Sequence, residues 1–298
     1  MAKPAKTIQE QVQLLKDRGM LFHNIGDAPH FLANISYYRL KGYWWEMQSD
    51  KVNHKFHPNH YFEDIIDLYN FDRNFRLIIF NAIERIEIAI RAKLIYHMSL
   101  SYGPHWYNET AYFEKYKHHL FFKSKLTRDL ASSSEEFIIK HYNNHVTEEP
   151  ESWKALEILT LGSLSKLYQN LNHQLPEKAE IAKEFGLNNQ KYLASWLLST
   201  TYVRNIIAHH GRLWNRVIIN KYDWPKSTPY PLLSYIPNQH QRRKIFPLVS
   251  AIIYMNNVIS PGHHIKTELL DLFEQFPNTP LYKMGFPKNW SSEPIWKI

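Results

Sequence analysis

The segment from Tyr61 to Leu100 constrains the fold most, because it contains no glycine and no proline. Apolar side chains recur in it every three to four residues, which is the period of one face of an α-helix. This stripe consists of Ile65, Leu68, Phe75, Ile79, Ile83, Ile86 and Ile90. The pattern predicts one long helix.

Charged residues occur in this predicted helix as acid–arginine pairs. Asp72 interrupts the apolar stripe, and Arg76 stands one turn later, at the spacing that brings side chains together. Glu87 and Arg91 repeat the spacing. We expect these pairs either to orient the residues of a functional site or to join the helix to its neighbours, since buried charges usually pair.

Helical periodicity continues through most of the remaining chain. Thr7 can cap a first helix that carries Ile8, Val12 and Leu15 and stops at Gly19. Further helices are expected over residues 28–40, 111–130, 134–145, 151–172, 176–186, from Asn188 onward, 239–259 and 266–276. Residues 50–60 and the proline-rich segment 222–239 are expected to be loops, and no segment alternates as a strand does. The predicted class is all-α, with an N-terminal region (1–60), a core (61–260) and a C-terminal helix and tail (261–298).

Composition excludes several classes of function. The chain has no cysteine, which removes disulfides, thiolate metal sites and cysteine nucleophiles. Nine glycines are few for a Rossmann or P-loop nucleotide site. The 36 basic and 28 acidic residues leave a net charge of +8, which favours an anionic partner such as nucleic acid. We expect a cytoplasmic protein, because neither a signal peptide nor a membrane span is evident.

The most informative segment is residues 202–216, YVRNIIAHHGRLWNR. On a continuous helix, with about 100° between residues, four polar residues of this segment would form one stripe. They are Asn205, His209, Arg212 and Arg216. Arg204 precedes this stripe, and its long side chain can swing toward His209.

Arginine and histidine together suit the cleavage of an RNA phosphodiester. Arginine binds phosphate oxygens through paired hydrogen bonds and can stabilise the charge of a pentacoordinate phosphorane. Histidine titrates near neutrality, so it can take a proton from a 2′-hydroxyl or give one to the leaving 5′-oxygen. This chemistry needs no metal and no cofactor. The simpler alternative is a surface arginine and a hydrogen-bonded histidine.

Two clusters mix cations with aromatic rings, as single-stranded RNA binding requires. One covers residues 37–45 and the other residues 115–125. Aromatic residues at helical spacing also build cores, so both interpretations stay open. The cations expected to contact RNA are Arg39, Lys41, Lys123, Lys125, Arg212 and Arg216. His54, His57 and His60 have no carboxylate or cysteine in register, so we expect no metal site there.

Over roughly residues 7–220 the chain resembles the Abi-like (abortive infection, AbiD/AbiF type) proteins of bacterial phage defence. The resemblance rests on ordered blocks, namely residues 11–19, 36–44, 68–76, 86–91, 153–157, 161–165, 203–210 and 214–216. It implies a HEPN-like helical core with additional N- and C-terminal helices. The sequence signature of such a HEPN-like core is an arginine, a polar residue, a few spacer residues and a histidine.

The resemblance also implies an activity: a metal-independent endoribonuclease that leaves 2′,3′-cyclic phosphate and 5′-hydroxyl ends. Arg204 would contact the scissile phosphate, Asn205 would orient the site and His209 would be the acid or base, with His210 among the surrounding residues. The chain carries one credible copy of a motif that relatives use in pairs, which implies a homodimer. A cognate small non-coding RNA is a second implied partner. The alternative function is a non-catalytic regulator that holds such an RNA.

Overall fold

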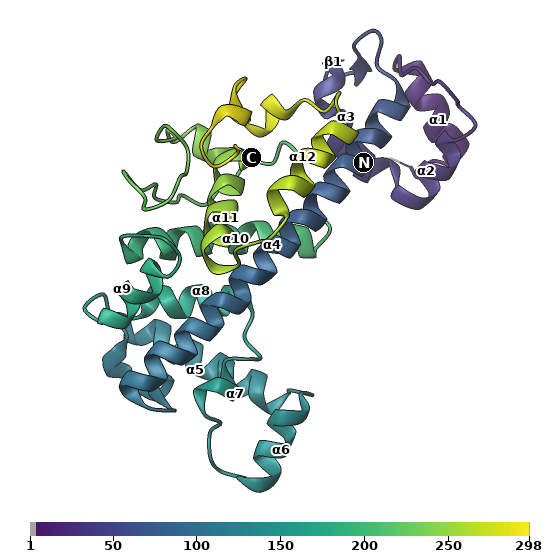
Figure 1. Cartoon of the computed structure of the whole chain (residues 1–298). Helices are drawn as coiled ribbons and strands as arrows, with labels where there is room; N and C mark the ends of the chain where they lie inside the picture. Colours follow the sequence, from purple (N-terminus) through teal and green to yellow (C-terminus); the bar gives the residue numbers. More distant parts are fainter. Residues whose placement is uncertain (1–3, 298) are drawn as a thin grey trace. The chain divides into compact units, whose positions relative to one another are not determined.

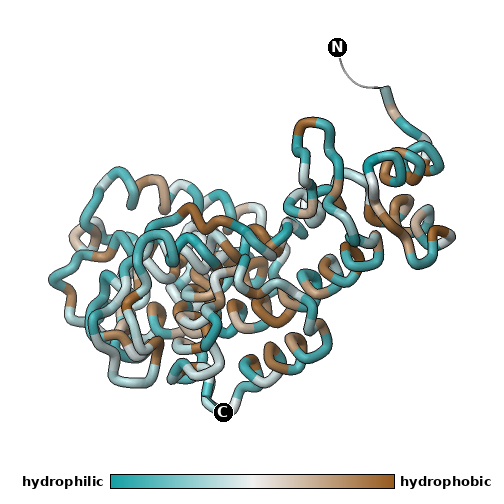
Figure 2. The backbone as a smooth tube through the Cα atoms, turned by 90° about the horizontal axis from the view of Figure 1, so that it is seen from above, coloured by the Kyte–Doolittle hydropathy of each residue, from teal (hydrophilic) through white to brown (hydrophobic). Residues whose placement is uncertain are grey.

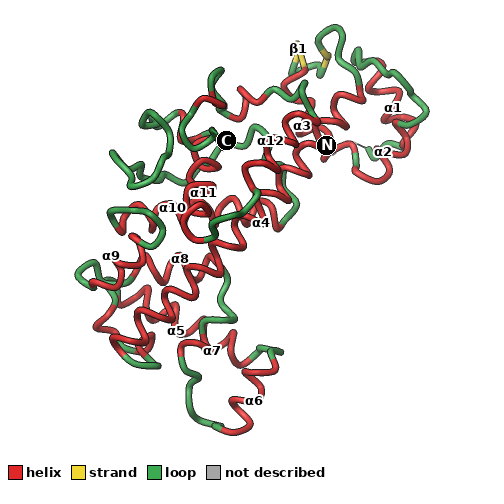
Figure 3. The backbone as a smooth tube through the Cα atoms, viewed as in Figure 1, coloured by secondary structure: helices red, strands yellow, loops and turns green. Residues whose placement is uncertain are grey.

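The computed structural model describes residues 4–297 and is predominantly helical, with long loops and two short strands (Figure 3). The prediction of an all-α fold is therefore confirmed. Hydrophobic and hydrophilic stretches alternate along the helices, as buried and solvated faces require (Figure 2). None of the helices within residues 4–297 is long and apolar enough to cross a membrane.

The chain divides into two compact units. Unit 1 comprises residues 1–77 and 269–279, and unit 2 comprises residues 78–268 and 280–298. The boundaries expected from sequence, after residues 60 and 260, stay predictions.

Unit 1 contains three short helices, a small hairpin and parts of two further helices (Figure 1). Its elements are α1 (Ile8–Asp17), α2 (Ala28–Ile35), α3 (Tyr37–Trp44), β1 (Gln48–Asp50), β2 (Lys55–Phe56), the start of α4 (Phe62–Tyr102) and most of α12 (Ile265–Gln275). Thr7 caps α1 as predicted: its hydroxyl accepts from the Glu10 N–H, and the Glu10 carboxylate accepts from the Thr7 N–H.

Unit 2 is built from the rest of α4 and seven further helices. They are α5 (Tyr116–Ala131), α6 (Glu136–Asn144), α7 (Ser152–Ala155), α8 (Leu161–Asn170), α9 (Pro176–Lys183), α10 (Gln190–Ala208) and α11 (Ile245–Ile259). Short 3₁₀ turns occupy Trp106–Asn108, Thr110–Tyr112, Gln241–Arg243, Leu281–Met284 and Trp290–Ser292.

The long helix α4 is confirmed, and its predicted apolar stripe is buried. The core of unit 2 forms around α11, whose residues from Ile245 to Asn256 are all buried. Asn256 donates to the Ala82 carbonyl of α4 at 3.1 Å, and Tyr254 packs edge-on against Trp196 of α10. The helix that is apolar on all sides is therefore the one that the others enclose.

Two helix predictions are wrong because the backbone turns where the apolar pattern continues. Residues 28–40 are not one helix, since Ser36 adopts a left-handed φ of 75° and ends α2. The Ser36 hydroxyl then caps α3 by accepting the Arg39 N–H at 3.3 Å. Residues 151–172 likewise form two helices, α7 and α8, separated by residues 156–160.

The segment 50–60 is not only a loop, because β2 pairs with β1 in an antiparallel hairpin. Asp50 shapes the turn: its carboxylate accepts the N–H groups of Val52 and Asn53 at 2.8 and 2.9 Å. Because the Asp50 carboxylate binds the backbone N–H groups of the turn, the turn needs no glycine. The sequence therefore lacks the glycine that usually indicates a hairpin, and its pattern reveals no strand here.

Candidate functional site

Helix α10 carries Arg204 and Asn205. Asn189 caps it by accepting the Lys191 N–H at 2.9 Å. One face is buried by Leu193, Trp196, Leu197, Thr200, Val203 and Ile207, and α10 packs beside α8 (Figure 1). Asn205 is exposed and Arg204 partly exposed, so the end of α10 presents polar groups to solvent.

The prediction of one helix through residue 216 is wrong, because α10 ends at Ala208. His209 is the C-cap, and His210 adopts a left-handed φ of 54°. The N–H of His210 donates to the Ile207 carbonyl, and the N–H of Gly211 donates to the Ile206 carbonyl, each at 2.8 Å. These two bonds form a Schellman motif, which stops a helix. The C′ position with positive φ is His210 and not the usual glycine, so the sequence lacks the common signal for this helix end.

The helix end divides the predicted polar stripe. Asn205 and His209 stay one turn apart, with the His209 N–H donating to the Asn205 carbonyl at 3.1 Å, and both residues are exposed. Arg212 and Arg216 lie beyond α10, so they do not continue the stripe. The Arg212 guanidinium instead stands 5.7 Å from the centre of the buried Trp214 ring. Arg216 is exposed.

Arg204 meets a carboxylate of α4. Its Nε lies 3.9 Å from Oε2 of Glu87, which is too long for a hydrogen bond. The Arg204 side chain is 28% exposed and that of Glu87 17%, so the attraction acts in a partly water-excluded place. Glu87 therefore orients Arg204 mainly through charge.

Arg91 holds Glu87 in turn. Its Nη2 lies 3.4 Å from Oε1 of Glu87, which confirms that the predicted pair forms, and donates to the Leu159 carbonyl at 2.8 Å. Its Nη1 lies 3.7 Å from Oε2 of Glu157. The structure thus brings the predicted Glu87 near Arg204, and Arg91 ties Glu87 to the loop before α8.

Asp72 and Arg76 belong to unit 1. Nε of Arg76 lies 3.2 Å from Oδ2 of Asp72, as the spacing predicts, and the same oxygen accepts the Tyr43 hydroxyl at 2.7 Å. Burial, then the Asp72 charge, raises the pKa of Tyr43 well above its usual range, so its hydroxyl stays a donor. These three side chains join α3 to α4. A role of Asp72 and Arg76 in orienting the site stays a prediction.

Four cations expected to bind RNA have differing surroundings. Lys41 lies 5.5 Å from the Trp45 ring centre, and Arg39 is exposed. Lys123 donates to both carboxylate oxygens of Glu149 at 2.9 and 2.7 Å, and Lys125 pairs with Asp129. Since Glu149 and Asp129 already pair with Lys123 and Lys125, these two lysines are less able to hold a phosphate than an unpaired lysine would be. RNA contact by these residues stays a prediction.

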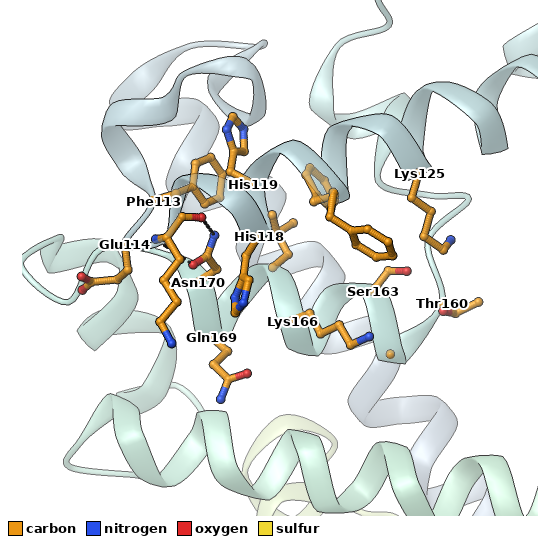
Figure 4. Close-up of a pocket in the computed structure, with 15 residues that line it drawn as sticks. Phe113, Glu114, His118, His119, Lys125, Thr160, Ser163, Lys166, Gln169 and Asn170 are labelled. Carbon is orange, nitrogen blue, oxygen red and sulfur yellow. Dashed lines mark hydrogen bonds between the residues drawn. The ribbon is translucent and has the colours of Figure 1, made fainter.

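A groove of about 800 Å³ lies between α5 and α8 (Figure 4). We call it the α5–α8 groove. Sequence reasoning found its α5 side through the cluster at residues 115–125, and it missed the α8 side, which includes Ser163, Lys166 and Gln169. No spacing rule relates these two segments, so only their packing reveals the groove.

Metal-binding groups do not gather in the described part of the chain. No cluster of three or more histidine, aspartate or glutamate side chains is placed there to hold an ion. His57 and His60, two of the three loop histidines, have ring centres 6.3 Å apart.

Comparison with known proteins identifies the chain's family. The family model for Abi-like proteins matches residues 30–215, which is more than half of the 298 residues and includes Arg204, Asn205 and His209. No curated protein and no solved structure matches the chain. The chain therefore belongs to the Abi-like family.

Proposed function

We propose that this protein is an effector of bacterial phage defence that cleaves RNA at Arg204 and His209, without a metal, in the cytoplasm. Membership of the Abi-like family supports the defence role. The observation that carries the chemistry is the end of α10, where His209 is exposed as the helix cap and Arg204 is held by Glu87.

The residues present can divide the reaction between them. A neutral His209 takes the proton of a 2′-hydroxyl, and that oxygen attacks the adjacent phosphorus. The bond from phosphorus to the 5′-oxygen breaks, and a protonated histidine gives its proton to the leaving oxygen. The products are a 2′,3′-cyclic phosphate and a 5′-hydroxyl. The Arg204 guanidinium stabilises the negative charge that builds up on the phosphorane oxygens.

Two histidines serve this reaction better than one, because it needs both a base and an acid. A homodimer would supply the second His209. The exposed side of α4 offers a surface for it, consisting of Ile88, Ala92, Tyr96 and Leu100 at four-residue intervals. We call this the α4 apolar stripe. Ile88 follows Glu87 directly, so two copies that pack here would bring their Arg204 residues to the same interface.

The decisive experiment is incubation of end-labelled mixed RNA with the full-length protein in EDTA. Wild type should produce fragments with cyclic-phosphate ends. His209→Ala and Arg204→Ala should each lower the cleavage rate by about 10²-fold or more, since each removes a group that acts in the transition state. His240→Ala, which removes an exposed histidine outside the site, is the matched control.

Equal cleavage by wild type and His209→Ala would overturn the catalytic assignment. Tight RNA binding by both proteins with no cleavage would favour the non-catalytic regulator that holds a small RNA.

The dimer has its own test. Ile88→Asp places a charge in the α4 apolar stripe and should lower both the dimer fraction in sedimentation and the cleavage rate. Val146→Asp, at an exposed valine in a loop, should change neither. A wild-type protein that is monomeric and fully active would contradict this part of the proposal.

A further inference from the structure

We propose that the α5–α8 groove binds an unpaired stretch of RNA, separately from the residues around Arg204. The inference rests on the proposed function only in taking RNA as the ligand. The proposed surface includes Lys115 and Lys125 of the cluster at residues 115–125. It does not include Lys123, because Lys123 does not line the groove.

The size of the groove fits a short single strand. Its volume of about 800 Å³ is within the range of sites that enclose ligands. Along α5 the lining extends from Lys115 to Lys125. The seven residue steps from His118 to Lys125 rise by about 10 Å, roughly the height of three stacked nucleotides. Unpaired bases can stack on aromatic rings and bond through their edges, whereas the bases of a duplex are already stacked and paired, so the proposed occupant is single-stranded.

The charge of the groove is positive. Lys115 and Lys166 line it from opposite sides, and within residues 4–297 neither ammonium lies within 4 Å of a carboxylate. Figure 4 shows Lys166 pointing into the space between the helices together with His118. Two lysines not bound to acids are what phosphate groups require.

One acid also lines the groove, and it is already engaged. The Glu114 carboxylate accepts the His173 N–H at 2.7 Å and lies 2.5 Å from Nδ1 of the same histidine. The backbone hydrogen bond from His173, followed by the bond from its side chain, lowers the pKa of Glu114, so the acid stays ionised in this pairing. Because two nitrogens of His173 hold this carboxylate, it is directed toward His173 and not toward a phosphate in the groove.

An exposed aromatic ring supplies the second element of recognition. Phe121 is 63% exposed although it is fully apolar, and Phe122 lines the groove beside it. A ring left in solvent next to lysines suits base stacking, which tolerates any base. An acidic peptide would use the lysines and leave Phe121 in water, so the ring favours RNA.

Polar groups complete the lining without blocking it. The Asn170 side chain is occupied, because it accepts from the Lys115 N–H at 3.0 Å and donates to the Lys115 carbonyl at 3.2 Å. Asn170 thereby fastens the start of α5 to α8 (Figure 4). Thr160, Ser163 and Gln169 add hydroxyl and amide groups to the lining, which can contact base edges and 2′-hydroxyls.

Affinity for RNA tests the proposal directly. The probe is a fluorescein-labelled, unstructured 12-nucleotide RNA, with the full-length His209→Ala protein as the background so that the probe stays uncut. Fluorescence anisotropy measures Kd at several salt concentrations. Phe121→Ala should weaken binding about tenfold with the salt dependence unchanged, because stacking is lost. Phe121→Leu, which keeps the apolar bulk, should not restore the affinity.

Lys166→Glu should also weaken binding about tenfold, and it should reduce the slope of log Kd against log salt by about one phosphate contact. Two matched controls should stay within about twofold of the background protein. Leu120→Ala truncates an exposed side chain of α5 outside the groove, and Lys140→Glu makes the same charge change on α6. Circular dichroism melting checks that every variant is folded.

The proposal is overturned if Phe121→Ala and Lys166→Glu bind the probe as tightly as the two controls do. Binding of a poly-glutamate peptide without binding of RNA would also overturn it, in favour of an acidic protein partner. Failure of the ribonuclease proposal looks different, because His209→Ala would then cleave like wild type while the groove variants still changed the affinity.

Discussion

Helix α4 carries the same acid–arginine spacing in both units, with different surroundings. In unit 1 the side chains of Asp72 and Arg76 are 0% and 7% exposed, and the Tyr43 hydroxyl donates to the acid. In unit 2 the side chains of Glu87 and Arg91 are 17% and 14% exposed, and the acid faces the 28% exposed Arg204. The first pair fastens a core, whereas the second holds an arginine that solvent can reach. The same acid–arginine spacing therefore predicts that an ion pair forms, but it does not predict whether the pair stabilises a core or orients a functional residue.

The largest expected effect is on the buried pair. Asp72→Ala leaves the Arg76 charge and the Tyr43 hydroxyl buried without this acceptor, and it should lower the free energy of unfolding by about 3–5 kcal/mol. Urea denaturation followed by circular dichroism measures this loss. Glu84→Ala, at an exposed acid of the same helix, should cost less than about 0.5 kcal/mol. If both variants lose the same small amount, the comparison between the two pairs fails.

At the second pair, Glu87 and Arg91, we expect a smaller effect on stability and a clear effect on RNA cleavage. Glu87→Gln keeps the shape of the side chain and removes the charge that orients Arg204. It should lower RNA cleavage by about tenfold while the free energy of unfolding falls by about 1 kcal/mol or less. Single-turnover cleavage and urea denaturation separate the two quantities. A loss of stability as large as that of Asp72→Ala would show that Glu87 is structural.

The smallest effect is expected at a third acid that α4 engages. Glu184 lies 2.6 Å from Lys93 and 3.1 Å from His97. Burial alone would raise the pKa of Glu184, but hydrogen bonding and charge from Lys93, then His97, lower it below 4.5. A lowered pKa stabilises the fold above the unfolded value, and this contribution disappears as pH falls from about 4.5 through the folded pKa.

Glu184→Gln should therefore cost less than about 1 kcal/mol at pH 7, because the acid is about one-third exposed and water screens it. Thermal melts from pH 7 to pH 3 should show the difference from wild type shrinking as the pH falls below about 4.5. A difference that grows with acidity would contradict the assignment.

Local sequence determines much of this protein. The apolar stripe of α4, the Thr7 cap and the acid–arginine spacings all predict what the structure contains, because helix periodicity, capping and i,i+4 pairing act within a few residues. Two of the helix predictions that failed lie where one residue changes the backbone direction. Ser36 and His210 both have positive φ without being glycine, so the usual signal is missing.

Only the tertiary structure decides which distant segments meet. Packing of α10 near α4 places Arg204 within reach of Glu87, and packing of α5 on α8 creates the groove that holds Lys166 opposite Phe121. Burial differs between the two pairs on α4 for the same reason, since it depends on what other segments cover each turn. The sequence by itself determined most of the helices, the pairs along them and the Arg204–His209 motif. Contacts between segments far apart in the chain decided which charges are buried and which face solvent, because no local period encodes them.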